Sequence, residues 1–252
     1  MNAKPPVISR KIGLIGGLSF PSTITYYDRL NRLVNQRLGS AHSARIVLES
    51  LDFQPVADWL ATGNGAAVTA ELCSAGQRLV DAGADLVAMC CNTVHKHAAS
   101  VQAALPVPLV NICIATAREA ARQGAQTVAL LGSTYSMEDS FYRSEFERLG
   151  VRVRVPELDD RRFIQRAIET ELSVGDISSA TRARFVRIAR ELCDQGAQSV
   201  VLACTEIPLV IGARDVPVPV IDTVQVHCAA ILSSAFDFTH VAPRSITCAA
   251  PI

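Results

Sequence analysis

Short apolar runs alternate with longer segments of helical periodicity along most of the chain. The run KIGLIGG, at 11–17, is rich in β-branched residues and ends in glycines, and the segment after it repeats its apolar residues at helical spacing. In the first half, strands are predicted at 11–17, 44–53, 84–90 and 106–112, and helices at 22–39, 66–82 and 93–104. Strands that alternate with helices indicate crossover units, and therefore a parallel sheet.

The second half of the chain repeats this order. TVALLGST matches KIGLIGGLS, AQSVVLACTEI matches ADLVAMCCNTV, and VPVPVIDT matches VPLVNI, with a predicted helix at 137–149 that matches the first one. Matching landmarks, such as Cys91 and Cys204, keep nearly the same offset through the whole half. A repeat of this length indicates a duplicated α/β unit.

We therefore predict an α/β fold of two similar parallel-sheet domains, related by internal duplication, with the active site between them. The first domain is expected to comprise 1–113 and 224–252, because the last helix, from 224 to about 238, returns to it. The second domain is expected to comprise 114–223. The tail from 239 onward is predicted to be a loose terminus.

Composition excludes several classes of function. The 24 basic and 24 acidic residues cancel, so the chain has no electrostatic footprint for nucleic acid or for an anionic membrane surface. No apolar run is long enough to cross a bilayer, and the amino-terminal segment lacks the apolar core of a signal peptide. We therefore expect no nucleic-acid or membrane partner. We expect a cytoplasmic location. The eight cysteines, without CxxC spacing, indicate reduced thiols.

Two of these cysteines follow apolar strands at equivalent places in the two halves. Ligands of an open α/β sheet bind beyond the carboxyl ends of its strands, where Cys91 and Cys204 both fall. A helix that starts after each thiol is expected to lower its pKa toward neutrality. Further polar residues are expected at the same edge, in the motifs CNT and CTE and in the turns GGLS and GST: Asn92, Thr93, Thr205, Glu206, Ser19, Ser133 and Thr134.

This arrangement predicts a reaction type. Amides at a helix start suit a carboxylate, so a small carboxylate-bearing molecule is expected between the domains, with one thiol on each side. Two acid/base groups on opposite faces of one carbon can remove a proton from one side and return it from the other. The expected outcome is inversion of configuration.

The motifs GLIGGLSFPSTITYY, LDF, CNTVH, LLGSTYSM and CTEI resemble those of the aspartate/glutamate racemase family, the two-cysteine amino-acid racemases that do not use pyridoxal phosphate. The similarity extends over roughly 12–236 and is nearest to the bacterial aspartate/glutamate and broad-specificity subgroup. It implies that Cys91 and Cys204 are the two bases and that the chain forms a homodimer. It also implies which residues hold the α-carboxylate and amino group of the amino acid: Asn92, Thr93, Thr205, Ser133 and Thr134.

The resemblance also bears on the substrate. Aspartate-specific archaeal relatives carry two cations for the distal carboxylate. At the first of these positions the present chain has Val56 and Ala57, and at the second Arg162 is the apparent match. Arg162 either binds substrate or belongs to a solvated charge run, and with one cation missing a wider substrate range is plausible. Only three lysines are present, which independently favours a reaction without a cofactor.

Alternatives remain at this point. The chain is predicted to be an isomerase that racemises aspartate or glutamate, but a broad-specificity racemase, an isomerase of hydantoins or maleate, or a non-catalytic amino-acid-binding module has the same fold. Cys91, His95 and His97 do not have the spacing of a zinc site, so no metal is expected. His95 is instead a candidate for tuning Cys91. The other cysteines are expected to be packing residues, with Cys90 on the face opposite Cys91.

Overall fold

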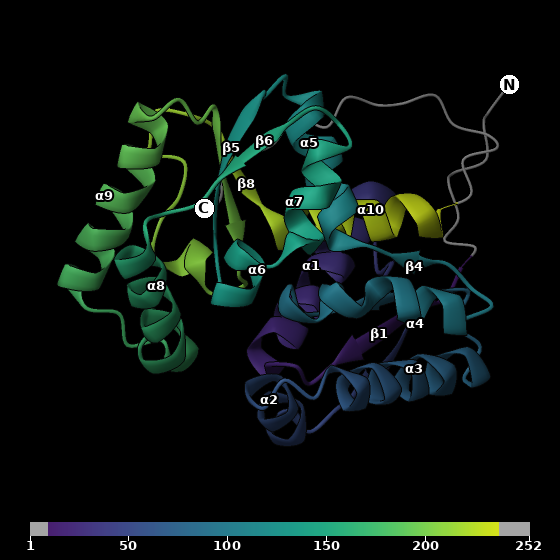
Figure 1. The fold of residues 1–252 in the computed structure, drawn as a ribbon. Helices are drawn as coiled ribbons and strands as arrows, with labels where there is room; N and C mark the ends of the chain where they lie inside the picture. The colour runs from purple at the N-terminus through teal and green to yellow at the C-terminus, as the bar shows by residue number, and fades with distance from the viewer. Residues whose placement is uncertain (1–9, 237–252) are drawn as a thin grey trace, which may run out of the picture.

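The computed structural model describes residues 10–236 and contains two four-stranded parallel sheets with helices on both faces (Figure 1). The first sheet has the order β2-β1-β3-β4, with β1 at Ile12–Gly16, β2 at Ile46–Ser50, β3 at Leu86–Met89 and β4 at Leu109–Val110. The second has the order β6-β5-β7-β8, with β5 at Thr127–Gly132, β6 at Arg152–Arg154, β7 at Ser199–Ala203 and β8 at Val220–Asp222. The same order in both halves confirms the predicted duplicated α/β fold.

Helices connect the strands and cover the sheets. Those of the first half are α1 (Phe20–Leu38), α2 (Phe53–Ala61), α3 (Gly65–Asp81) and α4 (Ala98–Ala104). Those of the second half are α5 (Ile112–Arg122), α6 (Thr134–Glu138), α7 (Ser140–Glu147), α8 (Leu158–Thr170), α9 (Ser179–Asp194) and α10 (Thr223–Ala235). Three short 3₁₀ helices are η1 (Thr93–His97), η2 (Leu172–Val174) and η3 (Ile207–Leu209).

Alternation along the strands divides the core of the first sheet between its two faces. Ile12 and Leu14 of β1 pack with α1 and α10, whereas Ile15 packs with α3 and α4. Cys90 belongs to the first of these cores, and Cys91 borders the second. The two adjacent thiols therefore point to opposite faces, as predicted.

The second sheet is covered in the same way. Ala129 and Leu131 of β5 pack against α8 and α9, and Val128 and Leu130 pack against α5 and α7. Burial on both faces explains why β5 and β7 read as nearly continuous apolar runs rather than as alternating patterns.

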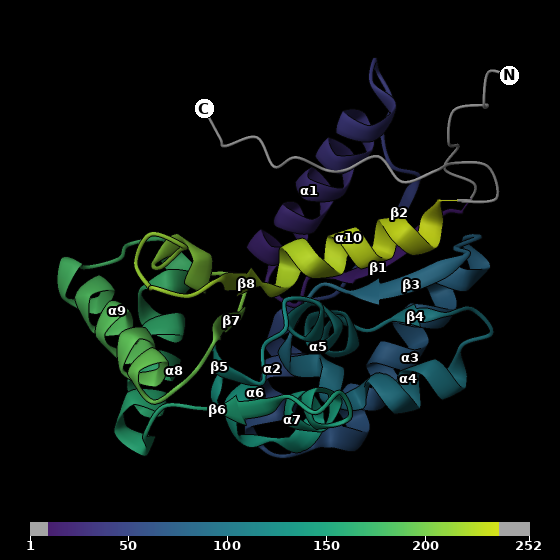
Figure 2. The same cartoon turned by 90° about the horizontal axis from the view of Figure 1, so that it is seen from above.

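The last helix crosses from the second sheet to the first. In Figure 2, α10 leaves β8 and lies beside α1, and its side chains belong to the same core as β1 and β3. α5, in contrast, packs on the second sheet from Ile112 onward, so the predicted limit after residue 113 falls inside this helix. We propose the same two domains with that limit moved to residue 111. The predicted tail from 239 lies outside the described residues.

Candidate active site

The two candidate thiols lie at matching edges of the two sheets. Cys91 follows β3 and Cys204 follows β7, and each of these strands is central in its sheet. Both side chains are partly buried. The thiols are also near enough to interact, because a negative charge on Cys91 contributes to the raised pKa of Cys204.

Polar contacts join the loops of the two halves around the cysteines. Thr93 Oγ1 lies 3.0 Å from Ser133 Oγ, and Ser22 Oγ lies 2.6 Å from Thr205 Oγ1. The other contacts are a bond from the Tyr142 hydroxyl to Asn92 Oδ1 and one from Ser19 Oγ to Glu206 Oε1, at 3.2 Å. The structure thus brings together most of the predicted residues, from elements far apart in sequence: Ser19, Asn92, Thr93, Ser133, Thr205 and Glu206.

Cys204 donates a hydrogen bond to a carboxylate. Its Sγ lies 2.9 Å from Glu206 Oε2, while Oε1 of the same carboxylate accepts from Ser19 and, at 3.4 Å, from Ser22. Burial raises the pKa of Cys204 well above its usual value, and the negative charge of Glu206 raises it further. The resting form of Cys204 is therefore the protonated thiol.

Cys91 is surrounded mainly by hydrogen-bond donors. Burial raises its pKa, but the backbone N–H groups of Val94 and Thr93 act in the opposite direction. The charge of Glu206 also raises this pKa, by a smaller effect. On the backbone, the carbonyl oxygen of Cys91 lies 2.7 Å from His95 Nδ1.

The predicted lowering of the two thiol pKa values is wrong. Backbone amides do lower the pKa at both positions, but burial outweighs them. The elements that directly follow the thiols, η1 and η3, are short 3₁₀ helices, and in the first half the predicted helix at 93–104 becomes an α-helix only from Ala98. A short 3₁₀ turn has a small dipole, so its effect on a thiol is small.

The turn that carries Ser19 has an unusual backbone. Gly17 has φ +77°, and a Cβ atom there would lie 2.0 Å from the carbonyl oxygen of Leu51, so only glycine fits. Ser19 itself has φ 93° and ψ 109°, a conformation that is costly for a residue with a side chain. This strained backbone places the Ser19 hydroxyl on Glu206.

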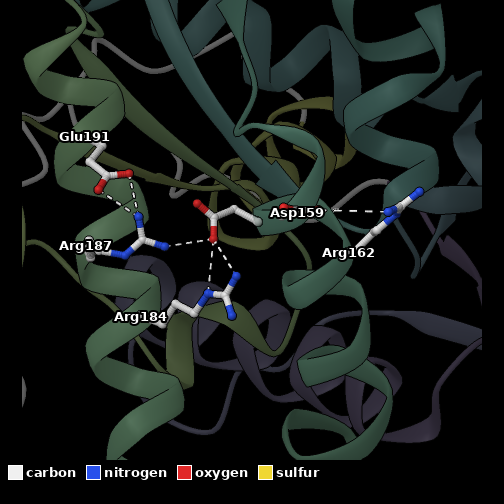
Figure 3. Close-up of polar contacts among 6 residues, drawn as sticks. Asp159, Arg162, Arg184, Arg187 and Glu191 are labelled. Atoms are coloured by element: carbon white, nitrogen blue, oxygen red, sulfur yellow. Dashed lines mark hydrogen bonds and ion pairs between the residues drawn. The ribbon is translucent and has the colours of Figure 1, made fainter.

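Arg162 is not brought to the other candidate residues. Its side chain is 68 % exposed and lies 3.9 Å from Asp159, which is also exposed. Figure 3 shows this pair apart from Arg184, Arg187 and Glu191 of α9, and the two arginines also bind Asp160 of α8. Arg162 therefore belongs to a solvated charge run in this structure, which was the other interpretation of the sequence.

The neighbouring Arg161 faces the candidate site more closely. Its side chain is 23 % exposed, and NH1 lies 3.2 Å from Glu138 of α6. Gln165, one helical turn later, accepts a hydrogen bond of 2.8 Å from the backbone N–H of Thr134. Because residues four apart share one face of a helix, Arg161 and Gln165 both face the loop of Ser133 and Thr134. Nothing in the sequence distinguishes Arg161 from Arg162 until the rotation of α8 is known.

Two residues around the cysteines, Ser22 and Tyr142, are not predicted from the sequence. Ser22 lies in the first turn of α1. It belongs to the segment LSFPST, and its position directly after the glycine turn could have indicated a place near the site. Tyr142 bonds to Asn92 from 50 residues away and has no local signal.

Neither a metal cluster nor a membrane span is found among the described residues. Within 10–236, no group of three or more His, Cys, Asp or Glu side chains lies close enough to hold a metal ion. None of the helices in the same range has the length and apolarity required to cross a bilayer. Lys11 lies at the amino end of β1, opposite the cysteine edge, and Lys96 pairs with Asp139 at 3.0 Å.

Comparisons with known proteins cover most of the chain. The family model described as Asp/Glu/Hydantoin racemase matches residues 15–231. A candidate Asp/Glu racemase from Yersinia pestis is 40 % identical, with a TM-score of 0.85 over 90 % of this chain and 99 % of its own. An aspartate racemase homologue from Pyrococcus horikoshii is 30 % identical, with a TM-score of 0.79 over 90 % of this chain and 99 % of its own. The aspartate racemase of Picrophilus torridus, at 23 % identity, shares the fold, with a TM-score of 0.72 over 89 % of this chain and 94 % of its own.

Proposed function

Since the chain belongs to the Asp/Glu/hydantoin racemase family and is an isomerase, we propose that it interconverts the L and D forms of aspartate or glutamate without a cofactor. Membership confirms the family predicted from the sequence motifs. The observation that carries the proposal is the pair of thiols, Cys91 and Cys204, at equivalent strand ends and within electrostatic reach of each other.

The reaction that we propose needs one thiolate and one thiol. One sulfur removes the Cα proton from its side of the substrate, and the other donates its proton to the opposite side, so the two sulfurs exchange protonation states in each turnover. The contacts of the resting site favour Cys204 as the thiol, because it donates to Glu206. They favour Cys91 as the more easily ionised of the two, because burial raises its pKa less than the combined effect of burial and Glu206 raises that of Cys204, and backbone N–H groups oppose the rise.

Hydroxyl and amide groups of both halves would hold the substrate. Thr93 and Ser133 lie 3.0 Å apart and could each turn a hydroxyl toward an α-carboxylate. Asn92 and Thr205 add an amide and a hydroxyl beside the same loops. Donors that are already in place when negative charge develops on the carboxylate stabilise the carbanionic transition state.

For the distal carboxylate of an acidic substrate we propose Arg161 in place of Arg162. Arg161 Nε is buried without a hydrogen-bond partner, and its guanidinium faces the Thr134 loop, where a substrate carboxylate would compete with Glu138. A guanidinium binds a carboxylate bidentately. The buried apolar Val56 at the other expected cation position supports a broad substrate range as the second candidate function.

Chiral chromatography of a panel of amino acids with reduced protein tests the function directly. We expect racemisation of aspartate or glutamate by wild type and by Arg162→Met, with KM for acidic substrates raised in Arg161→Met. Equal rates on neutral and acidic amino acids would favour the broad-specificity racemase. Binding of an amino acid in calorimetry without any turnover would favour the binding module.

Assembly and location are further parts of the proposal. We propose a homodimer, by likeness to the family, and a cytoplasmic protein, because the seven cysteines within 10–236 are free. Light scattering coupled to gel filtration tests the first. Thiol counting on protein taken directly from cells tests the second.

A further inference from the structure

Two buried histidines contact each other beside the loop that carries Cys91. His95 belongs to η1 and is 3 % exposed, and His227 belongs to α10 and is fully buried. Their ring centroids are 5.5 Å apart and the rings are nearly perpendicular, at 79°. Neither imidazole takes part in the proposed reaction.

The partners of each ring determine which nitrogen carries the proton. A carbonyl oxygen can only accept, so His95 Nδ1, 2.7 Å from the carbonyl of Cys91, carries a hydrogen. By the same reasoning His227 Nε2 carries a hydrogen, because it lies 2.8 Å from the carbonyl of Val110. The unprotonated Nδ1 of His227 then accepts the hydroxyl hydrogen of Tyr26, at 2.8 Å. Both rings are neutral in this arrangement.

A second proton has no favourable place on either ring. His95 Nε2 is buried without a partner, and protonation of His227 Nδ1 would take away the acceptor of the Tyr26 hydroxyl hydrogen. Burial lowers the pKa of His95 to about 4 and, together with repulsion from His95, that of His227 to about 3. The two imidazoles therefore act as uncharged hydrogen-bonding groups at neutral pH.

His95 provides hydrogen bonds to the backbone of Cys91 and Asn92, just beyond the last hydrogen bond of the sheet. The last ladder bond before Cys91 runs from the N–H of Cys90 to the carbonyl of Ile15, at 2.9 Å. After it, the carbonyl of Cys91 accepts from the His95 ring, and the carbonyl of Asn92 accepts from the His95 backbone N–H at 3.1 Å. One residue thus fixes two successive peptide groups of the loop that carries the thiol.

We propose that His95 is a positioning residue that fixes the backbone of Cys91, and with it the direction of the thiol, while His227 supports the His95 ring. Support comes through the edge-to-face contact, with His227 itself held by Tyr26 and Val110. The kinetic consequence rests on the proposed racemase function. The structural consequence, a single fixed tautomer for each ring, does not.

The first test is therefore made on the wild-type protein by nitrogen NMR with ¹⁵N-labelled histidine. We expect His95 to carry its hydrogen on Nδ1 and His227 on Nε2, with no change of either signal between pH 8 and about pH 5. His95→Asn and His227→Gln assign the two signals. A His95 signal with the hydrogen on Nε2, or a titration near the ordinary histidine pKa, overturns the proposal.

The second test compares His95→Asn with His95→Leu, because the Asn and Leu side chains have the same branched shape. The amide nitrogen of Asn can replace Nδ1 as the donor to Cys91, whereas Leu has no donor. If the proposed reaction takes place, we expect His95→Leu to lose on the order of 10²-fold in kcat with little change in KM, and His95→Asn to recover most of the loss. The matched controls are His97→Asn and His97→Leu, because His97 is also buried but bonds to Thr69, away from Cys91.

Alkylation of Cys91 gives a readout that does not depend on racemase activity. Mass spectrometry of the Cys91 peptide follows its reaction with iodoacetamide as a function of pH. We expect the profile to move to higher pH in His95→Leu, because the thiol loses its alignment with the amides of Thr93 and Val94. His95→Asn is expected to match wild type.

A wild-type profile in a folded His95→Leu, or equal losses of kcat in the Asn and Leu variants, contradicts the proposal. If wild type shows no racemisation, the proposed function fails, while the NMR and alkylation tests still decide the role of His95.

Discussion

The loops of Cys91 and Cys204 follow equivalent strands of a duplicated fold but have different surroundings. Cys91 receives backbone N–H groups, and its carbonyl is held by a neutral histidine of its own domain. Cys204 donates to Glu206, a carboxylate that serines of the other domain hold in place. Duplication supplied two thiols at matching positions, and later divergence of their neighbours gave them different surroundings, with burial raising the pKa of both and the carboxylate of Glu206 raising that of Cys204 further.

This difference does not appear when kcat/KM is compared between the two directions of the reaction. Enantiomers have equal free energies in water, so kcat/KM must be the same in both directions whichever thiol is protonated at rest. An asymmetry between the two cysteines can appear only in kcat and KM separately, in pH dependence, or in isotope exchange.

Lowering the pH should reduce the free energy of unfolding through the two buried histidines beside Cys91, His95 and His227. The pKa of His95 is about 4 in the folded chain and that of His227 about 3, both below the unfolded value of 6.5. Below pH 6.5 the unfolded chain therefore binds more protons, and the free energy of unfolding falls as the pH falls toward 4. At pH 5 we expect a loss on the order of 2 kcal/mol for each ring. Urea unfolding at pH 7 and pH 5 measures it.

The control for this prediction is His227→Gln, which removes one titrating ring. Its loss of stability between pH 7 and pH 5 should be smaller than that of wild type, since the contribution of His227 is gone while those of His95 and His97 remain. An equal loss in the two proteins would mean that these rings do not set the pH dependence.

Replacing Glu206 by Gln should make the two thiols more alike. The charge of Glu206 raises the pKa of both Cys204 and Cys91, so its removal is expected to move the acid limb of kcat/KM to lower pH. Gln has one acceptor oxygen where Glu has two, so it cannot keep both the bond from Cys204 and the bond from Ser19, and kcat should also fall. The matched control is Glu119→Gln, which removes the same charge from a surface pair with Arg122. An unshifted limb would show that Glu206 does not tune the thiols.

The smallest expected effect concerns Ser19, which reaches Glu206 from a strained backbone with φ 93°. Ser19→Gly removes both the hydroxyl and the strain, whereas Ser19→Ala removes the hydroxyl alone. Both should lower kcat by about fivefold, the equivalent of one hydrogen bond of about 1 kcal/mol. The Gly variant should be more stable than the Ala variant by about 1 kcal/mol in thermal unfolding. Equal stabilities would show that the backbone at Ser19 costs little.

The residues at the carboxyl ends of the central strands were predictable, because parallel strands bring these ends to one edge of their sheet. The repeat was therefore enough to place Cys91 with Thr93 in one domain and Cys204 with Ser133 in the other, whereas the contact of Thr93 with Ser133 depends on how the two domains pack. What surrounds each thiol was less accessible. The pKa directions depend on burial, and the contacts of His227 with Tyr26 and Val110 join residues 201 and 117 positions apart.

Local periodicity also gave the wrong helix type after both cysteines and missed four helices altogether. The helices α2, α5, α8 and α9 are not predicted, although each has an apolar face. The two interpretations of Arg162 could not be separated for a related reason, since adjacent positions on α8 point about 100° apart and only packing decides that Arg161 is the more buried and Arg162 the more exposed.

Exchange of the Cα hydrogen in deuterium oxide tests the central claim most directly, with Cys91→Ser and Cys204→Ser beside wild type and each enantiomer supplied separately. If each thiol serves one face, neither variant racemises, with losses of about 10²–10⁴-fold, and each still exchanges one enantiomer, a different one for each variant. The same enantiomer exchanged by both variants, or racemisation that survives either substitution, would contradict the two-thiol account.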